Sequence, residues 1–356
     1  MYFLYILLAI LIFGILVATH ELGHFTAAKL FRVRVNEFSI GMGPAIWKKQ
    51  GRETLYALRC IPFGGYCAME GEDEQSEDPR AFSNARWPKR LVILVAGAFM
   101  NFLVGFLVLA CIYGLPGRYA QLPVPVVSSL ETGCSLAEGG VQAGDRIYSI
   151  DGERVYTTDD IVNLPSMLGG NRFDLVVIRS GEKVTLPDVP YEARTFSTES
   201  GETLRYGINL TLQDRNLGTL LSYSANSGLG MVRVVRLSLQ MLLTGKASVT
   251  DMAGPVGIVK VMADAGTQSA TTALGIWTVL YLAALIAINL GVMNLLPIPA
   301  LDGGRVVGLL LTALVEAVLG RKVNSKIESY IHAGGMVVLL ALMALILLKD
   351  VIWIVR

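Results

Sequence analysis

Four long stretches of the sequence carry no charged residue, and this feature restricts the possible folds more than any other. The stretches are 2–19, 91–117, 265–301 and 330–348. A helix needs about 17 to 25 apolar residues to cross the hydrocarbon core of a bilayer, so each stretch can cross once. The composition agrees, because 53% of the residues are hydrophobic and only 17% are charged. We therefore predict a polytopic α-helical membrane protein with four transmembrane helices.

The positions of lysine and arginine predict how these helices are oriented. Basic residues gather after the first stretch, before the second, and between the third and the fourth. Short loops rich in lysine and arginine stay in the cytoplasm. Both termini and the segment between the second and third helices are therefore predicted to lie outside the cytoplasm. The predicted helices are about 2–24, 91–114, 273–301 and 330–352.

The segment 121–213 has the composition of a soluble domain rather than of a membrane helix. Short strand-like runs alternate with turn signals, and Asp151-Gly152 and Ser180-Gly181 are typical of tight hairpin turns. Residues 157–168 predict a short helix, which Pro165 should cut or kink. The predicted strands are 124–127, 146–150, 174–178 and 207–212.

Within this segment, the run 139–152 combines Gly-Asp-x-Ile with a following Asp-Gly. This run resembles the core of a PDZ domain, and a generic small α/β fold is the alternative. The charge rule places the segment outside the cytoplasm. We therefore predict one extracytoplasmic PDZ-like α/β domain, which we expect to exclude substrates with bulky outer domains.

Residues 36–71 lie between the first two predicted helices and alternate in polarity, with many glycines. Alternation of this kind indicates β-strands, and the run Pro62-Phe63-Gly64-Gly65-Tyr66 suits a tight turn. We predict a membrane-associated β-hairpin here.

Residues 214–264 predict an amphipathic connecting segment. Leu229, Val232 and Val235 recur at helical spacing, and Arg233 and Arg236 lie off that face. A helix on the outer membrane surface would explain the pattern, and packing against the PDZ-like domain would explain it equally well. The predicted divisions of the chain are thus 1–120, 121–213, 214–264 and 265–356.

The end of the first apolar stretch carries the run His20-Glu21-Leu22-Gly23-His24. Two histidines four positions apart project from the same face of a helix, which suits two ligands of one tetrahedral zinc ion. Glu21 lies where it can take a proton from a zinc-bound water. Histidine and glutamate are costly within a membrane segment and are functional there by default. The sequence therefore predicts a Zn²⁺ site with Glu21 as the catalytic base.

A catalytic zinc usually has three protein ligands and one water, so a third ligand is needed. The third apolar stretch ends in a helix-breaking run with two prolines, followed by Asp302. By the predicted orientation, Asp302 lies on the same side of the membrane as His20 and His24. We predict that Asp302 is the third ligand. His332 is expected to be an interfacial or packing residue.

Together these motifs resemble the bacterial site-2 proteases, of the type that cleaves membrane-bound anti-sigma factors and remnant signal peptides. The resemblance covers nearly the whole chain. Relatives of this type often carry two tandem PDZ domains, whereas this chain has room for one. The matching motifs are the HExxH run, Gly64 to Tyr66, Asn101-Phe102, the PDZ-like segment, Gly254 to Ile258, and the NxxPxPxLDG run from Asn294.

The resemblance implies roles for several of these residues. Asp302 would be the third zinc ligand and Glu21 the general base, and Asn294 would help to hold the substrate backbone or the oxyanion. The hairpin residues Gly64, Gly65 and Tyr66 would offer an edge strand to an unwound substrate helix. Asn101 is expected to form a hydrogen bond between two helices rather than to contact the substrate.

These observations predict an intramembrane zinc metalloprotease that hydrolyses bonds within the transmembrane segments of single-span proteins. The expected partners are such a substrate and the lipid bilayer. The net charge of +1 gives no reason to expect nucleic acid, and the sequence makes no prediction of oligomeric state. One alternative is a non-catalytic membrane scaffold that binds peptides through its PDZ-like domain. Another is a metal transporter, against which the single metal-binding cluster argues.

Overall fold

The computed structural model describes residues 2–72, 76–115, 120–198, 201–248, 253–269, 271–319 and 325–355. The chain divides into two units. We call residues 1–108 and 238–356 the helical unit, and residues 109–237 the β-rich unit. Each unit is described separately below.

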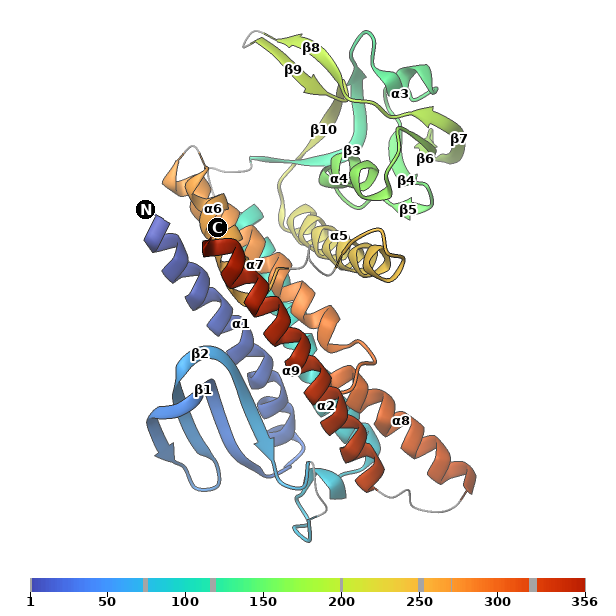
Figure 1. Cartoon of the computed structure of the whole chain (residues 1–356). Helices are drawn as coiled ribbons and strands as arrows, with labels where there is room; N and C mark the ends of the chain where they lie inside the picture. The colour runs from blue at the N-terminus through green and yellow to red at the C-terminus, as the bar shows by residue number, and fades with distance from the viewer. Residues whose placement is uncertain are drawn as a thin grey trace. The chain divides into compact units, whose positions relative to one another are not determined.

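Four helices of the described chain are long and apolar enough to cross a membrane, as predicted (Figure 1). In the last of them the apolar window is Ala333–Asp350. Two shorter helices, α6 (Pro255–Thr267) and α8 (Asp302–Leu319), belong to the same unit. The four long helices are α1 (Tyr2–Leu30), α2 (Trp87–Gly114), α7 (Thr272–Asn294) and α9 (Ser325–Val355).

The first helix, α1, continues beyond the predicted residue 24 and ends at Leu30. Arg32 adopts a left-handed conformation with φ of 63°. The backbone N–H of Val33 donates to the carbonyl of Ala28, and that of Arg32 donates to the carbonyl of Lys29. This pair of bonds is a Schellman motif, which satisfies the last carbonyls of a helix. Both histidines of the HExxH run therefore lie inside the helix rather than at its frayed end.

The third long helix, α7, ends at Asn294, so the predicted extension to residue 301 is wrong. Pro297 and Pro299 explain the difference, because proline removes a backbone donor and clashes with the preceding helical turn. The loop that follows includes Ala300 with φ of 78°, and a new helix, α8, begins at Asp302. This helix, α8, was not predicted from the sequence.

A long β-hairpin precedes α2, as predicted, and is formed by β1 (Val35–Gln50) and β2 (Leu55–Met69). Residues 37–40 of β1 pair with both 55–58 and 65–68 of β2, so this part of β1 lies between two segments of β2. Residues 65–69 therefore form an outer edge of the hairpin.

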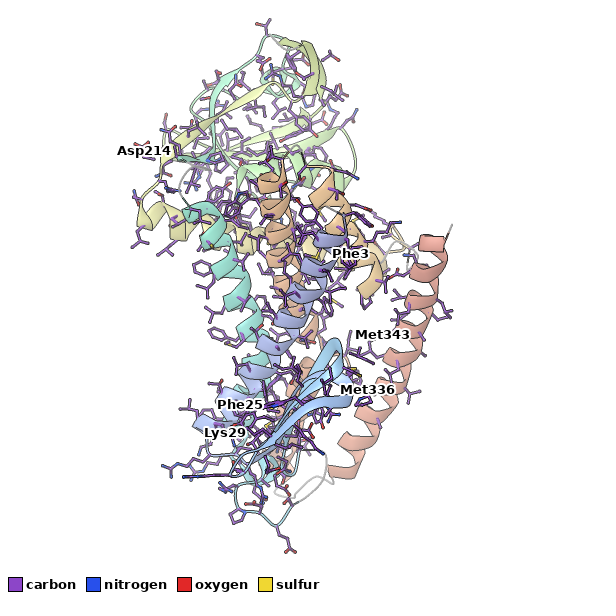
Figure 2. The ribbon with its side chains drawn as sticks, turned by 90° about the vertical axis from the view of Figure 1, so that its left-hand side faces the viewer. Phe3, Phe25, Lys29, Asp214, Met336 and Met343 are labelled. Carbon is purple, nitrogen blue, oxygen red and sulfur yellow. The ribbon has the colours of Figure 1, made fainter. Side chains whose placement is uncertain are left out.

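The hairpin packs against the C-terminal part of α1, from which Phe25 and Lys29 project (Figure 2). The rings of Phe25 and Phe38 lie 5.0 Å apart. The ammonium group of Lys29 lies 2.5 Å from a carboxylate oxygen of Glu53, in the turn between the two strands. These contacts fix the hairpin relative to the helix that carries the histidines.

The helix α6 receives its N-terminal cap from a residue distant in sequence. Its own N-cap residue, Gly254, has no side chain to accept a hydrogen bond, and Pro255 follows it. The backbone N–H of Gly257 instead donates to Oδ2 of Asp350 in α9, at 2.8 Å. The Asp350 carboxylate is buried, and a carboxylate is stabilised at a helix N-terminus by the helix dipole. This contact attaches α9 to α6.

The β-rich unit is built on a sheet in the order β10-β3-β4-β6-β7, with β5 paired to β4. Its core is a cluster of buried apolar side chains that includes Leu136, Ile147, Ile150 and Leu175. The two predicted hairpin turns are confirmed, since Asp151, Gly152, Ser180 and Gly181 all have positive φ, as a type I′ turn requires. The strands are β3 (Gln121–Leu130), β4 (Arg146–Ile150), β5 (Glu153–Arg154), β6 (Arg172–Arg179), β7 (Glu182–Pro190), β8 (Arg194–Thr198), β9 (Gly201–Arg205) and β10 (Ile208–Asp214).

Three helices accompany these strands: α3 (Ser135–Glu138), α4 (Thr158–Leu168) and α5 (Leu217–Leu243), the last of which continues into the helical unit. Of the two effects expected of Pro165, a cut or a kink, the cut does not occur, because α4 runs through Pro165 to Leu168. A proline leaves the carbonyl four residues earlier without its helical donor. That carbonyl belongs to Ile161, and the hydroxyl of Tyr191 donates to it at 2.7 Å. A tertiary hydrogen bond thus replaces the missing helical one.

The helix α5 packs on the β-rich unit through a face that differs from the predicted one. Arg233, expected off the buried face, is buried and forms an ion pair with the buried carboxylate of Asp160 in α4. Leu229, expected on that face, is 50% exposed. Asp160 also accepts hydrogen bonds from the backbone N–H groups of Tyr156 and Thr157. The ion pair explains the difference, because it makes burial of the arginine favourable.

Replacing Arg233 by Leu should destabilise the β-rich unit by about 3–5 kcal/mol, because the change leaves the Asp160 carboxylate buried without a cation. Arg236, on the same helix, is 52% exposed and pairs with Glu153 at 2.5 Å. Its replacement by Leu should cost at most about 1 kcal/mol, as exposed pairs do. Hydrogen–deuterium exchange of α4 and α5 in the full-length protein measures both effects. Equal protection in the two variants would contradict the prediction.

Candidate metal centre

His20 and His24 lie on one face of α1 and are both buried. Their Nε2 atoms are 3.2 Å apart, and the two rings are nearly perpendicular. The helical spacing therefore brings the two imidazoles together as the sequence predicted.

Asp302 completes the cluster from α8, where it is the first residue. Its Oδ2 atom lies 3.2 Å from the Nε2 atom of His20 and 3.2 Å from that of His24. The three atoms thus form a nearly equilateral triangle. A tetrahedral zinc ion with bonds of about 2.0–2.2 Å holds its ligands about 3.3–3.6 Å apart. The triangle is close to one face of such a tetrahedron, and the fourth position is left for water or substrate.

Oδ2 of Asp302 is buried and makes no hydrogen bond within the part of the chain that the structure describes. A buried carboxylate oxygen without a donor is costly. Two histidines and one carboxylate form a donor set typical of catalytic zinc. The unsatisfied oxygen and the donor set both fit a zinc ion at this position.

The second ring nitrogen of His24 is fixed by the backbone. Nδ1 lies 2.8 Å from the carbonyl oxygen of Ile93 in α2. The carbonyl can only accept, so His24 carries its proton on Nδ1 and leaves Nε2 free to bind a metal.

Gly97 in α2 forms the wall of the cluster behind the two imidazoles. A Cβ atom placed on Gly97 would lie 2.3 Å from Nε2 of His24 and 2.7 Å from Cε1 of His20. Gly23 allows the same close approach from the other helix, because a Cβ atom there would lie 2.3 Å from the carbonyl oxygen of Ala96. From the sequence Gly97 is only a packing glycine of an apolar helix, because its contacts with the two histidines arise only when the two helices are packed.

The turn between α7 and α8, which positions Asp302, also requires glycine. A Cβ atom on Gly303 would lie 2.3 Å from the carbonyl oxygen of Leu296, and one on Gly304 would lie 2.3 Å from that of Ile298. The loop after α7 therefore folds directly onto the first turn of α8. This packing holds Asp302 opposite the two histidines.

The other predicted site residues lie at different distances from the cluster. The amide nitrogen of Asn294 lies 3.4 Å from Nδ1 of His20. A Cβ atom on Gly65 would lie 3.3 Å from Cγ of Glu21, so this edge of the hairpin borders the predicted base. The hydroxyl of Tyr66 lies 3.4 Å from the guanidinium of Arg59. Gly64 faces Met42, and the side chain of His332 lies outside the described residues.

Comparison with known proteins identifies the class of protein that carries this site. Residues 8–342 match Peptidase family M50. The chain belongs to this family, the site-2 proteases, and is a zinc metalloprotease of bacterial membranes.

Relatives that match over nearly the full length agree with this class. A protein of Clostridium acetobutylicum, provisionally named a zinc metalloprotease, is 37% identical over 99% of both chains. Zinc metalloprotease RasP of Bacillus licheniformis is 29% identical, with 96% of this chain and 97% of the relative covered. The regulator of sigma-W protease RasP of Bacillus subtilis is 27% identical with the same coverage.

Proposed function

We propose that the protein hydrolyses peptide bonds within the transmembrane segments of single-span membrane proteins. Candidate substrates are anti-sigma factors after trimming of their outer domains, and remnant signal peptides. The observation that carries the proposal is the cluster of His20, His24 and Asp302, of which the two histidines lie on a helix of membrane-spanning length. The name of the Bacillus subtilis relative, a regulator of sigma-W, supports a substrate that controls a sigma factor.

In this proposal, His20, His24 and Asp302 hold the zinc ion. When bound, zinc supplies Lewis acidity that activates a water molecule and polarises the scissile carbonyl. Glu21 takes a proton from the attacking water and passes it to the leaving amine. The amide of Asn294 beside His20 donates a hydrogen bond to the developing oxyanion.

The hairpin edge would hold the substrate in an extended form. A transmembrane helix hides its peptide bonds in its own hydrogen bonds, and unpaired backbone groups in lipid are costly. The edge formed by residues 65–69 offers replacement partners by strand addition. Its position beside Glu21 supports this role, with the backbone of Gly64, Gly65 and Tyr66 as the binding strand.

The β-rich unit would act as a filter on the outer side of a cytoplasmic membrane. We assign it a PDZ-like fold and an extracytoplasmic location, with both chain termini on the same side and the metal site near the cytoplasmic face. Two features support the fold. The Gly-Asp-x-Ile run leads into β4, which begins at Arg146, and the Asp-Gly turn follows the end of that strand. The basic loops of the helical unit support the orientation. In this role the unit admits only substrates without bulky outer domains.

Purified protein in proteoliposomes should cleave a single-span substrate at a bond inside its membrane segment. Chelation of zinc should stop the cleavage, and added Zn²⁺ should restore it, because coordination of the metal by its protein ligands is reversible. Mass spectrometry of the products locates the bond. Cleavage only in a loop outside the membrane segment would contradict the intramembrane assignment while leaving the metalloprotease class intact.

A further inference from the structure

Asn101 lies in α2 and is fully buried, with 0% of its surface exposed. Its amide nitrogen lies 3.2 Å from Nδ1 of His20. Its other amide atom, Oδ1, is buried and has no hydrogen-bond partner within the described residues. The expected hydrogen bond between helices is therefore present, but its partner is a residue of the metal cluster.

The two ends of an asparagine amide have nearly the same shape, so the hydrogen-bond network decides their assignment. With the NH₂ group facing Nδ1, His20 must carry its proton on Nε2. Nε2 is the atom that lies 3.2 Å from Asp302, and a protonated nitrogen cannot bind a metal. This orientation also leaves the carbonyl end of a buried amide without a donor, which is costly.

Rotating the amide by half a turn removes both difficulties. Oδ1 then accepts a hydrogen bond from the Nδ1–H group of His20, and Nε2 is free to face the metal. His24 already has this arrangement, with the carbonyl of Ile93 as the acceptor. We propose that Asn101 is a positioning residue that fixes the tautomer and ring orientation of His20 for zinc binding.

Asn294 is the other amide near His20, and its geometry fits this role less well. Its nitrogen lies 3.4 Å from Nδ1 and 3.5 Å from Nε2, so it is directed at neither ring nitrogen alone. It is also only partly buried, at the last position of α7. The fully buried Asn101 is thus the acceptor for His20, which leaves Asn294 available to a substrate.

The test measures the zinc affinity of the full-length protein in detergent by competition with a chelator. Asn101→Leu keeps the approximate shape but removes the acceptor, and it should weaken zinc binding by about 10- to 100-fold, as loss of such partners does. Asn101→Asp keeps an acceptor and should bind zinc nearly as tightly as the wild type. The visible spectrum of the Co²⁺-substituted protein should change in Asn101→Leu and not in Asn101→Asp.

Tyr5→Phe is the matched control, since the Tyr5 hydroxyl makes a hydrogen bond from α1 to the carbonyl of Thr272, distant from the cluster. It should leave both the zinc affinity and the Co²⁺ spectrum unchanged. Equal zinc affinity in Asn101→Leu and the wild type, or equal weakening in both Asn101 variants, would overturn the proposed role. The inference rests on the proposed zinc site. A wild-type protein that binds no zinc would refute the site itself, whereas normal zinc binding by wild type and Asn101→Leu would refute only the role of Asn101.

Discussion

Glu21→Gln should reduce the cleavage rate of a transmembrane substrate by about 10²–10⁴-fold, the usual contribution of a general base. Glutamine has the size of glutamate but cannot take a proton from the attacking water. The zinc content and the thermal stability should stay unchanged, because Glu21 is not one of the three ligands. The measurement combines single-turnover cleavage in proteoliposomes with metal analysis of the same sample.

His20→Ala is the companion variant, since it removes a ligand rather than the base. It should lose both the cleavage and the bound zinc. The two variants therefore separate the loss of chemistry from the loss of metal. Unchanged cleavage in Glu21→Gln would rule out Glu21 as the base and would refute the mechanism proposed above.

Gly97→Ala should abolish stoichiometric zinc binding and lower cleavage at least about 100-fold, in the range of damage to a metal site. The added methyl group would lie 2.3 Å from Nε2 of His24, where the metal must approach. Weakening of the helix cannot cause the loss, because alanine is a better helix former than glycine by about 1 kcal/mol.

Gly334→Ala supplies the control for this substitution. Gly334 lies in α9, and a Cβ atom there would meet nothing within 4 Å. The change should leave zinc binding and cleavage as in the wild type. If Gly97→Ala retained a full complement of zinc, the packing of α2 against the two histidines would have to differ from that described.

The parts of the structure that the sequence predicted depend on local signals. The charge-free runs predict the four long helices, because apolar length alone decides whether a helix can cross a membrane. The spacing of His20 and His24 predicts their shared face, and the two prolines predict that the third long helix breaks before Asp302, although the predicted end at residue 301 was too late. Asp151-Gly152 and Ser180-Gly181 predict their turns, because those turns require positive φ.

The parts that the sequence did not predict arise from contacts between distant segments. The sequence pattern predicts that Arg233 faces solvent, because it gives no sign that Asp160 lies beside Arg233 in the folded chain. Pro165 predicts a break in the helix, because the sequence does not show that the Tyr191 hydroxyl donates to the carbonyl left without its helical hydrogen bond. The sequence predicts a hydrogen bond between helices for Asn101 but does not identify His20 as the partner, and the contacts of Gly97 with the two histidines arise only when α2 is packed against them. Local periodicity contains no information on such pairs.

The three atoms of the metal cluster come from opposite parts of the chain, since His20 and His24 precede Asp302 by most of the sequence. During synthesis the two histidines enter the membrane long before the ribosome has made Asp302. Until then they have no third partner, so the hydrolytic centre cannot form on the growing chain. The proposed zinc site is therefore complete only in a chain that extends as far as α8.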